Sequence, residues 1–340
     1  MPQMGDAGSD SSSLPLVSIV VVTYNSVSEI SRCLESVGRQ THPRVDVLVV
    51  DNHSSDRTVE ILRSLGTDFR LLENNTNVGF AAAHNQGIRL AAGEYYLALN
   101  PDVEMTPTFI EELLKAMALD PQVGSVSGKL LRFARVNGTH LIDSTGIYMT
   151  PSLRHFDRGS GQPDHGQYNR LQYVFGASGA AALYRRRMLE DVSLDGEYFD
   201  EDFFAYREDA DLAWRAQLMG WKALYTPHAV ATHERKVLPE RRRSLPEAIN
   251  MHSVKNRFLL RIKNQTLLEF IALLLPSLWR DLQVVGYVVL FERSSWPGLV
   301  FVARHHGRVR SKRKRVMSQR RAKAWEMLRW FRNHPVAFDI

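Results

Sequence analysis

The feature that most constrains the fold is a regular alternation of strand-like and helix-like segments over the first 130 residues. Residues 17–22 (VSIVVV) and 45–50 (VDVLVV) are apolar, β-branched runs, which are typical of parallel strands buried on both faces. The segments that follow them read as helices ending at Gly38 and Gly66. The further elements predicted in this way are strands at 69–73, 95–100 and 123–128 and helices at 81–93 and 106–120. This alternation predicts an α/β fold with a mostly parallel sheet covered by helices on both faces.

Polar residues collect where the predicted strands end. They are Thr23, Tyr24 and Asn25 after the first strand, Asp51 after the second, and Asn100 and Asp102 after the fourth. Ligands of open parallel sheets bind at the carboxyl ends of the strands, so a binding site is expected there. The glycine signatures of dinucleotide-binding and P-loop proteins are missing. Taken alone, Asp51 and Asp102 also suit caps of turns or helices.

Three carboxylates crowd the start of a predicted helix in the stretch REDADLAWR. They are Glu208, Asp209 and Asp211, all within four residues. Acids are stabilised at the positive end of a helix dipole, and Asp211 can pair with Arg215 at the i,i+4 spacing. The alternative is that one of these acids takes part in a reaction. From this stretch alone, both interpretations remain open.

Seven segments, in order, resemble the family 2 glycosyltransferases, and most closely their bacterial rhamnosyltransferase-like branch. The segments are VVTYNS, VVDNHSSDRT, NVGFAAAHNQGI, LALNPDVE, FGASGAAALYRR, FDEDFFAYREDADLAWR and YTPHAVATH, and the resemblance covers roughly residues 17–233. The resemblance implies a GT-A fold, a nucleotide-sugar donor and a divalent metal, Mg²⁺ or Mn²⁺. It also implies an inverting transfer, for which a single carboxylate base is sufficient.

The resemblance assigns roles to individual residues. Those matching donor-binding positions are Thr23, Tyr24, Asn25, Asp51, Gly79, Asn85, Asn100 and Asp102. Asp102 and His233 match metal ligands, and Asp209 matches the catalytic base. Glu208 and Gly179 are expected on the acceptor side; Gly179 otherwise belongs to a turn before a helix. Asn100 stands where a first metal-binding Asp is often found, which leaves fewer carboxylates for the metal.

The positive charge of the chain is concentrated near its C-terminal end. The net charge is +6, but residues 304–332 contribute +11 (twelve Lys and Arg against Glu326), so the rest of the chain carries −5. The preceding apolar runs, 266–279 and 282–291, are each shorter than the roughly 20 residues of a spanning helix. Together with Trp279, Tyr287 and Trp296 they predict amphipathic helices in the interface of an anionic membrane. The alternative is a pair of core helices followed by a solvated basic tail.

These observations predict three regions: a disordered tail at 1–15, a GT-A domain at 16–263 and a membrane-associating segment at 264–340. Cys33 is the only cysteine, which fits a reducing compartment. We therefore expect a peripheral protein at the cytoplasmic face of the plasma membrane. The expected donor is dTDP-rhamnose or a UDP-sugar, and the acceptor is a polyprenyl-diphosphate-linked saccharide in cell-surface polysaccharide synthesis.

Two other functions fit parts of the sequence. One is a nucleotide-binding module with a basic arm for nucleic acid. The acidic body lacks the interleaved aromatic and basic residues expected for base stacking, so no nucleic-acid partner is expected. The other is an inactive glycosyltransferase-like scaffold, which is disfavoured because the base and metal positions, Asp209 and Asp102, are filled.

Overall fold

The computed structural model describes residues 14–235 and 245–340, so the predicted tail at 1–15 lies almost entirely outside the described residues. The strands are β1 (Val17–Thr23), β2 (Val45–Asp51), β3 (Arg70–Glu73), β4 (Tyr95–Leu99), β5 (Val103–Met105), β6 (Val123–Val136), β7 (Thr139–Ser144), β8 (Ile147–Met149), β9 (His155–Asp157), β10 (Gln172–Val174), β11 (Ala181–Arg185), β12 (Lys222–His233) and β13 (Phe338–Asp339). The helices are α1 (Ile30–Gly38), α2 (Thr58–Ser64), α3 (Phe80–Leu90), α4 (Phe109–Ala118), α5 (Arg186–Asp191), α6 (Glu208–Leu218), α7 (Glu247–Asn264), α8 (Leu267–Ala272), α9 (Leu274–Leu290), α10 (Trp296–Arg304), α11 (His306–Gln319) and α12 (Ala324–Met327). Short 3-10 helices are η2 (Glu201–Phe203), η4 (Arg293–Ser295) and η5 (Leu328–Trp330).

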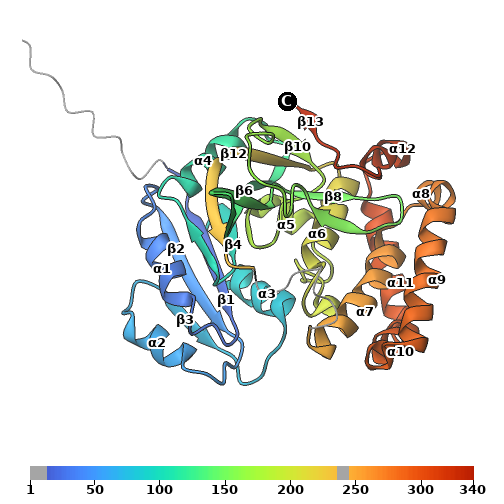
Figure 1. The fold of residues 1–340 in the computed structure, drawn as a ribbon, viewed down its shortest axis with the longest axis horizontal. Coiled ribbons are helices and arrows are strands. Elements are labelled where there is room, and N and C mark those ends of the chain that lie inside the picture. The colour runs from blue at the N-terminus through green and yellow to red at the C-terminus, as the bar shows by residue number, and fades with distance from the viewer. Residues whose placement is uncertain (1–13, 236–244) are drawn as a thin grey trace, which may run out of the picture.

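One large sheet organises the molecule, with the strand order β13-β10-β12-β6-β11-β4-β1-β2-β3 (Figure 1). Strands β3, β2, β1 and β4 are parallel, and Val17 of the central strand lies opposite both Val45 and Tyr95. This confirms the α/β prediction. The rest of the sheet is mixed, because β11 runs antiparallel between β4 and β6. Gly179 lies just before β11, so it precedes a buried strand and not the helix that the turn interpretation predicted.

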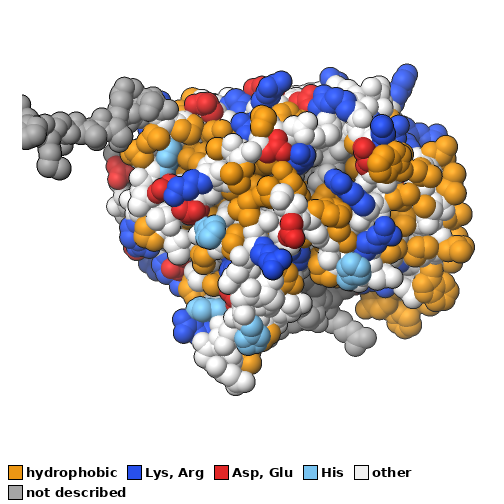
Figure 2. Space-filling view, turned by 90° about the horizontal axis from the view of Figure 1, so that it is seen from above, with side chains coloured by type: hydrophobic (Ala, Val, Ile, Leu, Met, Phe, Trp, Pro, Cys, Tyr) orange, Lys and Arg blue, Asp and Glu red, His pale blue; other side chains and the backbone are white. Residues whose placement is uncertain are grey.

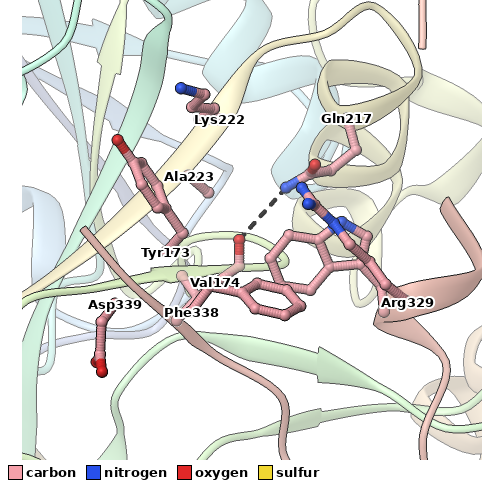
Figure 3. A pocket seen from close by; sticks show the side chains of 9 residues that line it. Tyr173, Val174, Gln217, Lys222, Ala223, Arg329, Phe338 and Asp339 are labelled. Carbon is pink, nitrogen blue, oxygen red and sulfur yellow. Dashed lines mark hydrogen bonds between the residues drawn. The ribbon is translucent and has the colours of Figure 1, made fainter. Parts of the chain in front are cut away.

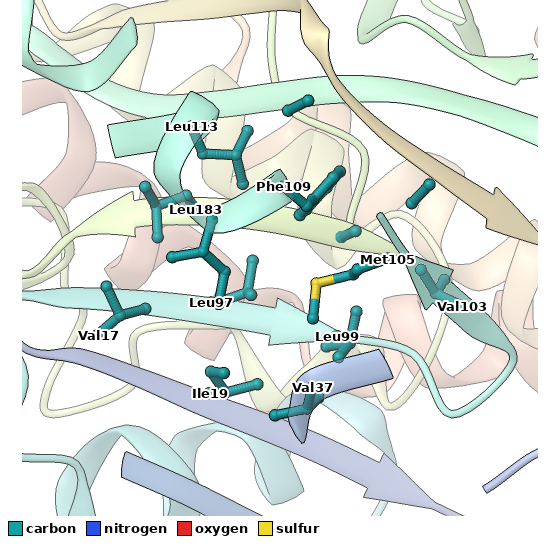
Figure 4. Packing of buried hydrophobic residues seen from close by; sticks show 14 of the residues in the cluster. Val17, Ile19, Val37, Leu97, Leu99, Val103, Met105, Phe109, Leu113 and Leu183 are labelled. Carbon is teal, nitrogen blue, oxygen red and sulfur yellow. The ribbon is translucent and has the colours of Figure 1, made fainter. Parts of the chain in front are cut away.

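Helices cover both faces of the parallel half, which explains why β1 is apolar at nearly every position. Val17, Ile19 and Val21 pack in one core cluster with residues of α1, α2 and α4 (Figure 4). Val20 and Val22 point to the other face and pack in a second cluster with residues of α3, α5 and α6. A strand buried on both sides needs apolar residues in both alternating positions.

The segment after residue 263 shares a hydrophobic core with the preceding chain. Val309, Val316 and Trp330 lie in one buried cluster with Phe175 and Trp214, and β13 pairs with β10 at the edge of the sheet. The division at residue 263 remains a prediction about domain organisation, but packing is continuous across it.

The basic helix α11 is not a solvated tail. Lys312 is buried, and its Nζ contacts carboxylate oxygens of Glu197 at 2.8 Å, Asp200 at 2.6 Å and Asp202 at 3.1 Å. Arg308 also pairs with Asp202. Part of the charge expected to face a membrane or nucleic acid is therefore neutralised by the acidic body of the protein.

Helices α8, α9 and α10 form one end of the molecule and expose many apolar side chains. Figure 2 shows hydrophobic side chains gathered at the end where Figure 1 places these helices. Leu275 is 79% exposed and Trp279 65% exposed. Within the described ranges no single helix has the length and hydropathy to cross a membrane, whereas α9 and the stretch Arg293–Arg304 satisfy both criteria as a pair bent by 111°.

Candidate active site

Asp102 and His233 meet at the carboxyl edge of the sheet, although 131 positions separate them. His233 ends β12 and lies opposite Val103, the first residue of β5, in an antiparallel pairing. This register places His233 Nε2 3.2 Å from Asp102 Oδ1. The two residues predicted as metal ligands are thus brought together.

Asp143 supports His233 from the other side and has no counterpart among the predicted site residues. It lies near the end of β7, and its Oδ2 is 2.7 Å from His233 Nδ1. Burial lowers the pKa of His233, but the interactions with Asp102 and Asp143 outweigh burial and raise it to about 9. A carboxylate behind a ligating histidine is the usual arrangement that orients the ring.

The residues at this edge fit a divalent cation. The buried Oδ1 atoms of Asn100 and Asp102 accept no hydrogen bond beyond the contact with His233. Such oxygens are the ligands that Mg²⁺ and Mn²⁺ prefer. Across residues 14–235 and 245–340, no group of three or more His, Cys, Asp or Glu side chains is arranged to hold a metal. A cation here would therefore need further oxygens from a bound diphosphate, which is how Mg²⁺ is commonly held.

Asp209 lies in the first turn of α6 and is fixed by backbone groups. Its Oδ2 accepts a hydrogen bond of 3.0 Å from the N–H of Gly179, and its Oδ1 accepts one of 2.7 Å from Ala210. A Cβ atom at Gly179 would stand 3.2 Å from the Cβ of Asp209, so only glycine leaves this approach unhindered. Burial raises the pKa of Asp209 above its ordinary value, which suits a proton acceptor.

The other two acids of this stretch have different environments. Asp211 is fully buried and pairs with Arg215 Nε at 3.0 Å, which confirms the predicted ion pair. It also accepts hydrogen bonds from Lys263 and Asn264 of α7. Glu208 is buried, and its Oε2 has no hydrogen-bond partner. Burial, followed by repulsion from Asp209, holds the pKa of Glu208 well above its usual range.

A chain of charged residues connects the base to the metal-ligand pair. Arg235 donates to Asp143 at 3.3 Å and to Asp157 at 2.6 Å. Both Asp157 and Arg235 are close enough to Asp209 to influence its pKa, the carboxylate raising it and the guanidinium lowering it. Asp157 and Arg235 both lie outside the seven segments that resemble the family, and no local pattern in the sequence identifies them.

The predicted donor loop forms a tight network around Asp51. The carboxylate accepts hydrogen bonds from Thr23 Oγ1 at 2.8 Å, Ser54 Oγ at 2.6 Å and Ser54 N at 2.9 Å. Asn25 has a positive φ of 51° and binds Ser55. Tyr24 is 52% exposed, so its ring is available to a ligand. The first loop and Asp51 are adjacent as predicted, with Asp51 also serving as a turn cap.

Gly79 and Asn85 stabilise the fold around the site. Gly79 has a φ of +89°, and a Cβ there would lie 2.6 Å from the ring of Phe204. The Asn85 side chain is fully buried; its amide donates to Phe199 O and Glu201 Oε1 and accepts from the N–H groups of Tyr198 and Phe199. Asn85 therefore has no free polar group for the donor contact expected from the sequence. It holds the loop that leads to α6.

A separate cavity of about 310 Å³ lies beside β10, β12 and β13 (Figure 3). Its lining includes Tyr173, Lys222 and Trp330. Gln217 reaches across to the carbonyl of Val174 at 3.3 Å. None of the predicted site residues lines this cavity, so it is distinct from the edge that carries Asp102 and Asp209.

Comparisons with known proteins identify the family of this chain. The family model described as Glycosyl transferase family 2 matches residues 18–193, just over half of the chain. The N-acetylglucosaminyl-diphospho-decaprenol L-rhamnosyltransferase of Mycobacterium tuberculosis is 29% identical over 241 residues, which cover 64% of this chain and 75% of that protein.

Two solved structures share the fold. One is the mannosyltransferase PcManGT from Pyrobaculum calidifontis in complex with GDP-Man and Mn²⁺, with a TM-score of 0.50 and 20% identity over 88% of this chain and 77% of that one. The other is GalNAc-T7 with UDP, GalNAc and Mn²⁺, with a TM-score of 0.57 and 16% identity over 74% of this chain and 48% of that one. The architecture described above is therefore that of GT-A glycosyltransferases.

Proposed function

This chain belongs to glycosyl transferase family 2, and from that premise we propose that it is an inverting glycosyltransferase with Asp209 as its catalytic base. The observation that carries the proposal is the environment of this carboxylate. Gly179 and Ala210 hold it in place, and burial raises its pKa. A general base is most effective when its pKa approaches the working pH.

In the proposed reaction, an acceptor hydroxyl attacks the anomeric carbon of the donor sugar from the face opposite the nucleotide. A bond forms between that oxygen and the anomeric carbon while the bond from the carbon to the diphosphate oxygen breaks. The hydroxyl proton passes to Asp209, and the nucleoside diphosphate leaves with the bonding electrons. A single displacement of this kind inverts the configuration at the anomeric carbon.

Asp102 and His233 would hold a divalent metal, with Asn100 as a further oxygen donor. When bound, Mg²⁺ or Mn²⁺ would neutralise the negative charge that develops on the diphosphate. The proposal is supported by the two buried Oδ1 atoms of Asn100 and Asp102 and by the placement of His233 between two carboxylates.

We further propose that the donor is dTDP-rhamnose and that the acceptor is a polyprenyl-diphosphate-linked saccharide used in cell-surface polysaccharide synthesis. The similarity to the mycobacterial rhamnosyltransferase, whose name specifies a diphospho-decaprenol-linked acceptor, supports both parts. UDP-sugars are the alternative donors. The nucleic-acid alternative is weakened by the engagement of Lys312 and Arg308 with acidic residues of the body.

The apolar surface of α8, α9 and α10 is proposed to rest in the membrane interface at the cytoplasmic face. Leu275, Leu278, Trp279 and Leu282 are all exposed and follow the i, i+3, i+4, i+7 spacing of one helix face. An exposed patch of this kind marks an interaction surface. A lipid-linked acceptor would be reached from such a position without a spanning helix.

Purified protein incubated with a panel of nucleotide sugars and a lipid-diphosphate-linked GlcNAc acceptor tests the function. The expected result is transfer from dTDP-rhamnose with inversion, detected by mass spectrometry and by the anomeric coupling in NMR spectra of the product. Transfer from a UDP-sugar alone would retain the enzyme class and replace the donor. Transfer with retained configuration would overturn the mechanism.

A further inference from the structure

Four arginines converge between the β8–β9 hairpin and helices α7 and α9. Arg154 ends the hairpin turn, Arg257 and Arg261 lie on α7, and Arg280 lies on α9. Among the ion pairs of the described residues, only Asp281 pairs with these arginines. It accepts a hydrogen bond from Arg257 at 2.9 Å and also contacts Arg261. The group, called here the arginine cluster, therefore carries a surplus of about three positive charges.

Several guanidinium N–H groups of the arginine cluster have no partner. The buried Nε atoms of Arg261 and Arg280 form no hydrogen bond. Arg154 stacks over the ring of Phe156 at 4.3 Å, an arrangement that leaves the edge of a guanidinium open to an anion. Burial, and then repulsion from Arg280 and Arg257, lowers the pKa of Arg154, so these charges are close together. Unpaired like charges at short range are unfavourable unless an anion neutralises them.

The hairpin connects the arginine cluster to the catalytic base. Asp157, which influences the pKa of Asp209, lies three residues after Arg154 on the same hairpin. Between them, His155 Nδ1 is 3.3 Å from Nη1 of Arg207, the residue immediately before the three acids of α6. The hairpin thus runs from the base at one end to the arginine cluster at the other.

On its other side, the arginine cluster borders the exposed apolar surface. Arg280 directly follows Trp279 on α9, and Leu282 is 59% exposed two residues later. A ligand that contacts both Arg280 and this face would be complementary to them if it had an anionic group joined to an apolar chain. For the proposed base Asp209 to act on the same ligand, that ligand would also carry a hydroxyl-bearing group on the far side of the anion.

We infer that the arginine cluster binds the diphosphate of the lipid-linked acceptor, with the prenyl chain along the exposed face of α9 and the saccharide directed towards Asp209. This inference rests on the proposed function and identifies the acceptor subsite within it. A diphosphate matches the surplus charge, and guanidinium groups bind phosphate oxygens through paired N–H donors.

Binding of farnesyl diphosphate, followed by calorimetry, tests the inference without requiring catalysis. The variants are Arg154→Gln and Arg280→Gln, since neither side chain takes part in a described ion pair. Arg293→Gln, which removes an exposed charge at the end of the same apolar region, is the matched control. We expect affinity to fall at least about tenfold in the two cluster variants and to stay unchanged in the control. Farnesol, which lacks the diphosphate, should bind all four proteins equally.

Two outcomes would overturn the inference. The first is equal binding of farnesyl diphosphate by wild type and both cluster variants. The second is that these variants lose binding to phosphatidylglycerol vesicles while their KM for a prenyl-diphosphate-linked saccharide is unchanged, which would make the cluster a lipid headgroup site. A protein that binds farnesyl diphosphate through the cluster but transfers no sugar would instead contradict the proposed function.

Discussion

The carboxylate of Asp209 accepts a 3.0 Å hydrogen bond from the backbone N–H of Gly179. The loop before β11 and the first turn of α6 thereby position each other, although 30 residues separate the two partners in the chain. This contact aligns one oxygen of the carboxylate, and it also stabilises the ionised form that a base requires.

Replacement Asp209→Asn should reduce kcat by at least about 100-fold while leaving the Kd of the donor nearly unchanged, because the base acts on the acceptor proton alone. Steady-state kinetics and donor calorimetry on the same preparation provide both quantities. The amide is nearly isosteric, so folding should be retained. A variant with more than about a tenth of wild-type turnover would rule out this residue as the base.

Glu208→Gln provides the contrast. Burial keeps the pKa of Glu208 well above its usual range, which favours the neutral acid, whose charge and shape a glutamine reproduces. We expect a loss of less than about tenfold in kcat. A loss as large as that of the Asp209 variant would mean that the proton of Glu208 is needed in the reaction.

The pH dependence of kcat/KM should reflect Asp209. Because the base acts when ionised and its pKa is raised from the ordinary 3.8, activity should fall as the pH drops through the raised value, and the acidic limb should lie above pH 3.8. Buffers of constant ionic strength between pH 4 and 9 measure this limb. A profile that stays flat down to pH 4 would contradict the raised pKa.

Removal of the metal should abolish turnover if Asp102 and His233 hold it. Asp102→Ala is expected to weaken Mn²⁺-dependent donor binding and kcat together, because a bound ion would contact both protein and diphosphate. Donor calorimetry with and without Mn²⁺ measures the coupling. Full activity in excess EDTA would show that the enzyme works without a divalent cation.

The buried carboxyl of Glu269 should make the protein less stable as the pH rises, whereas activity is expected to increase with pH. Burial raises its pKa from 4.5 to about 7. Between these values the folded state keeps a proton that the unfolded state has lost, so this contribution to the unfolding free energy is complete below pH 4.5 and disappears as the pH rises to 7. The change is roughly 3 kcal/mol. Glu269→Gln keeps the capping box with Thr266 and should remove this slope in urea denaturation at several pH values.

Lys312→Met should destabilise the protein by about 3–5 kcal/mol, because it removes the buried cation shared by Glu197, Asp200 and Asp202 and leaves Asp200 with Lys263 alone. Lys314→Met, at an exposed position of the same helix, should change the unfolding free energy by less than about 0.5 kcal/mol. Similar midpoints for the two variants in urea denaturation would refute the role of Lys312. For the same reason, truncation after Lys263 is expected to unfold the protein.

Local patterns were sufficient to predict the parallel half of the sheet and the Asp211–Arg215 pair, since strand burial and i,i+4 spacing depend on neighbouring residues. The meeting of Asp102 with His233 followed from the resemblance to a family, not from spacing. Asp143, Asp157 and Arg235 could not be predicted at all. Their proximity depends on how the β6–β7 and β8–β9 hairpins sit against the end of β12, which is a matter of tertiary packing.

The basic segment at 304–332 also shows that charge composition does not reveal which ion pairs form in the folded protein. Counting residues located a strongly positive stretch, but it did not reveal that the acidic residues around Asp200 lie beside Lys312, 112 positions away. Part of this positive charge is therefore neutralised within the molecule, and the expected membrane partner stays a prediction. The apolar runs at 266–279 and 282–291 were recognised from their composition alone, whereas the exposure of α9 became evident only from its packing.

Strand β12 has its parallel partner β6 about 100 positions earlier in the chain. The ribosome adds roughly 5–20 residues per second. The synthesis of β12 would therefore follow that of β6 by on the order of ten seconds. During this interval one long strand edge remains open, and open edges invite pairing with other chains. Synthesis rate and chaperone supply should therefore influence how much native enzyme a cell obtains.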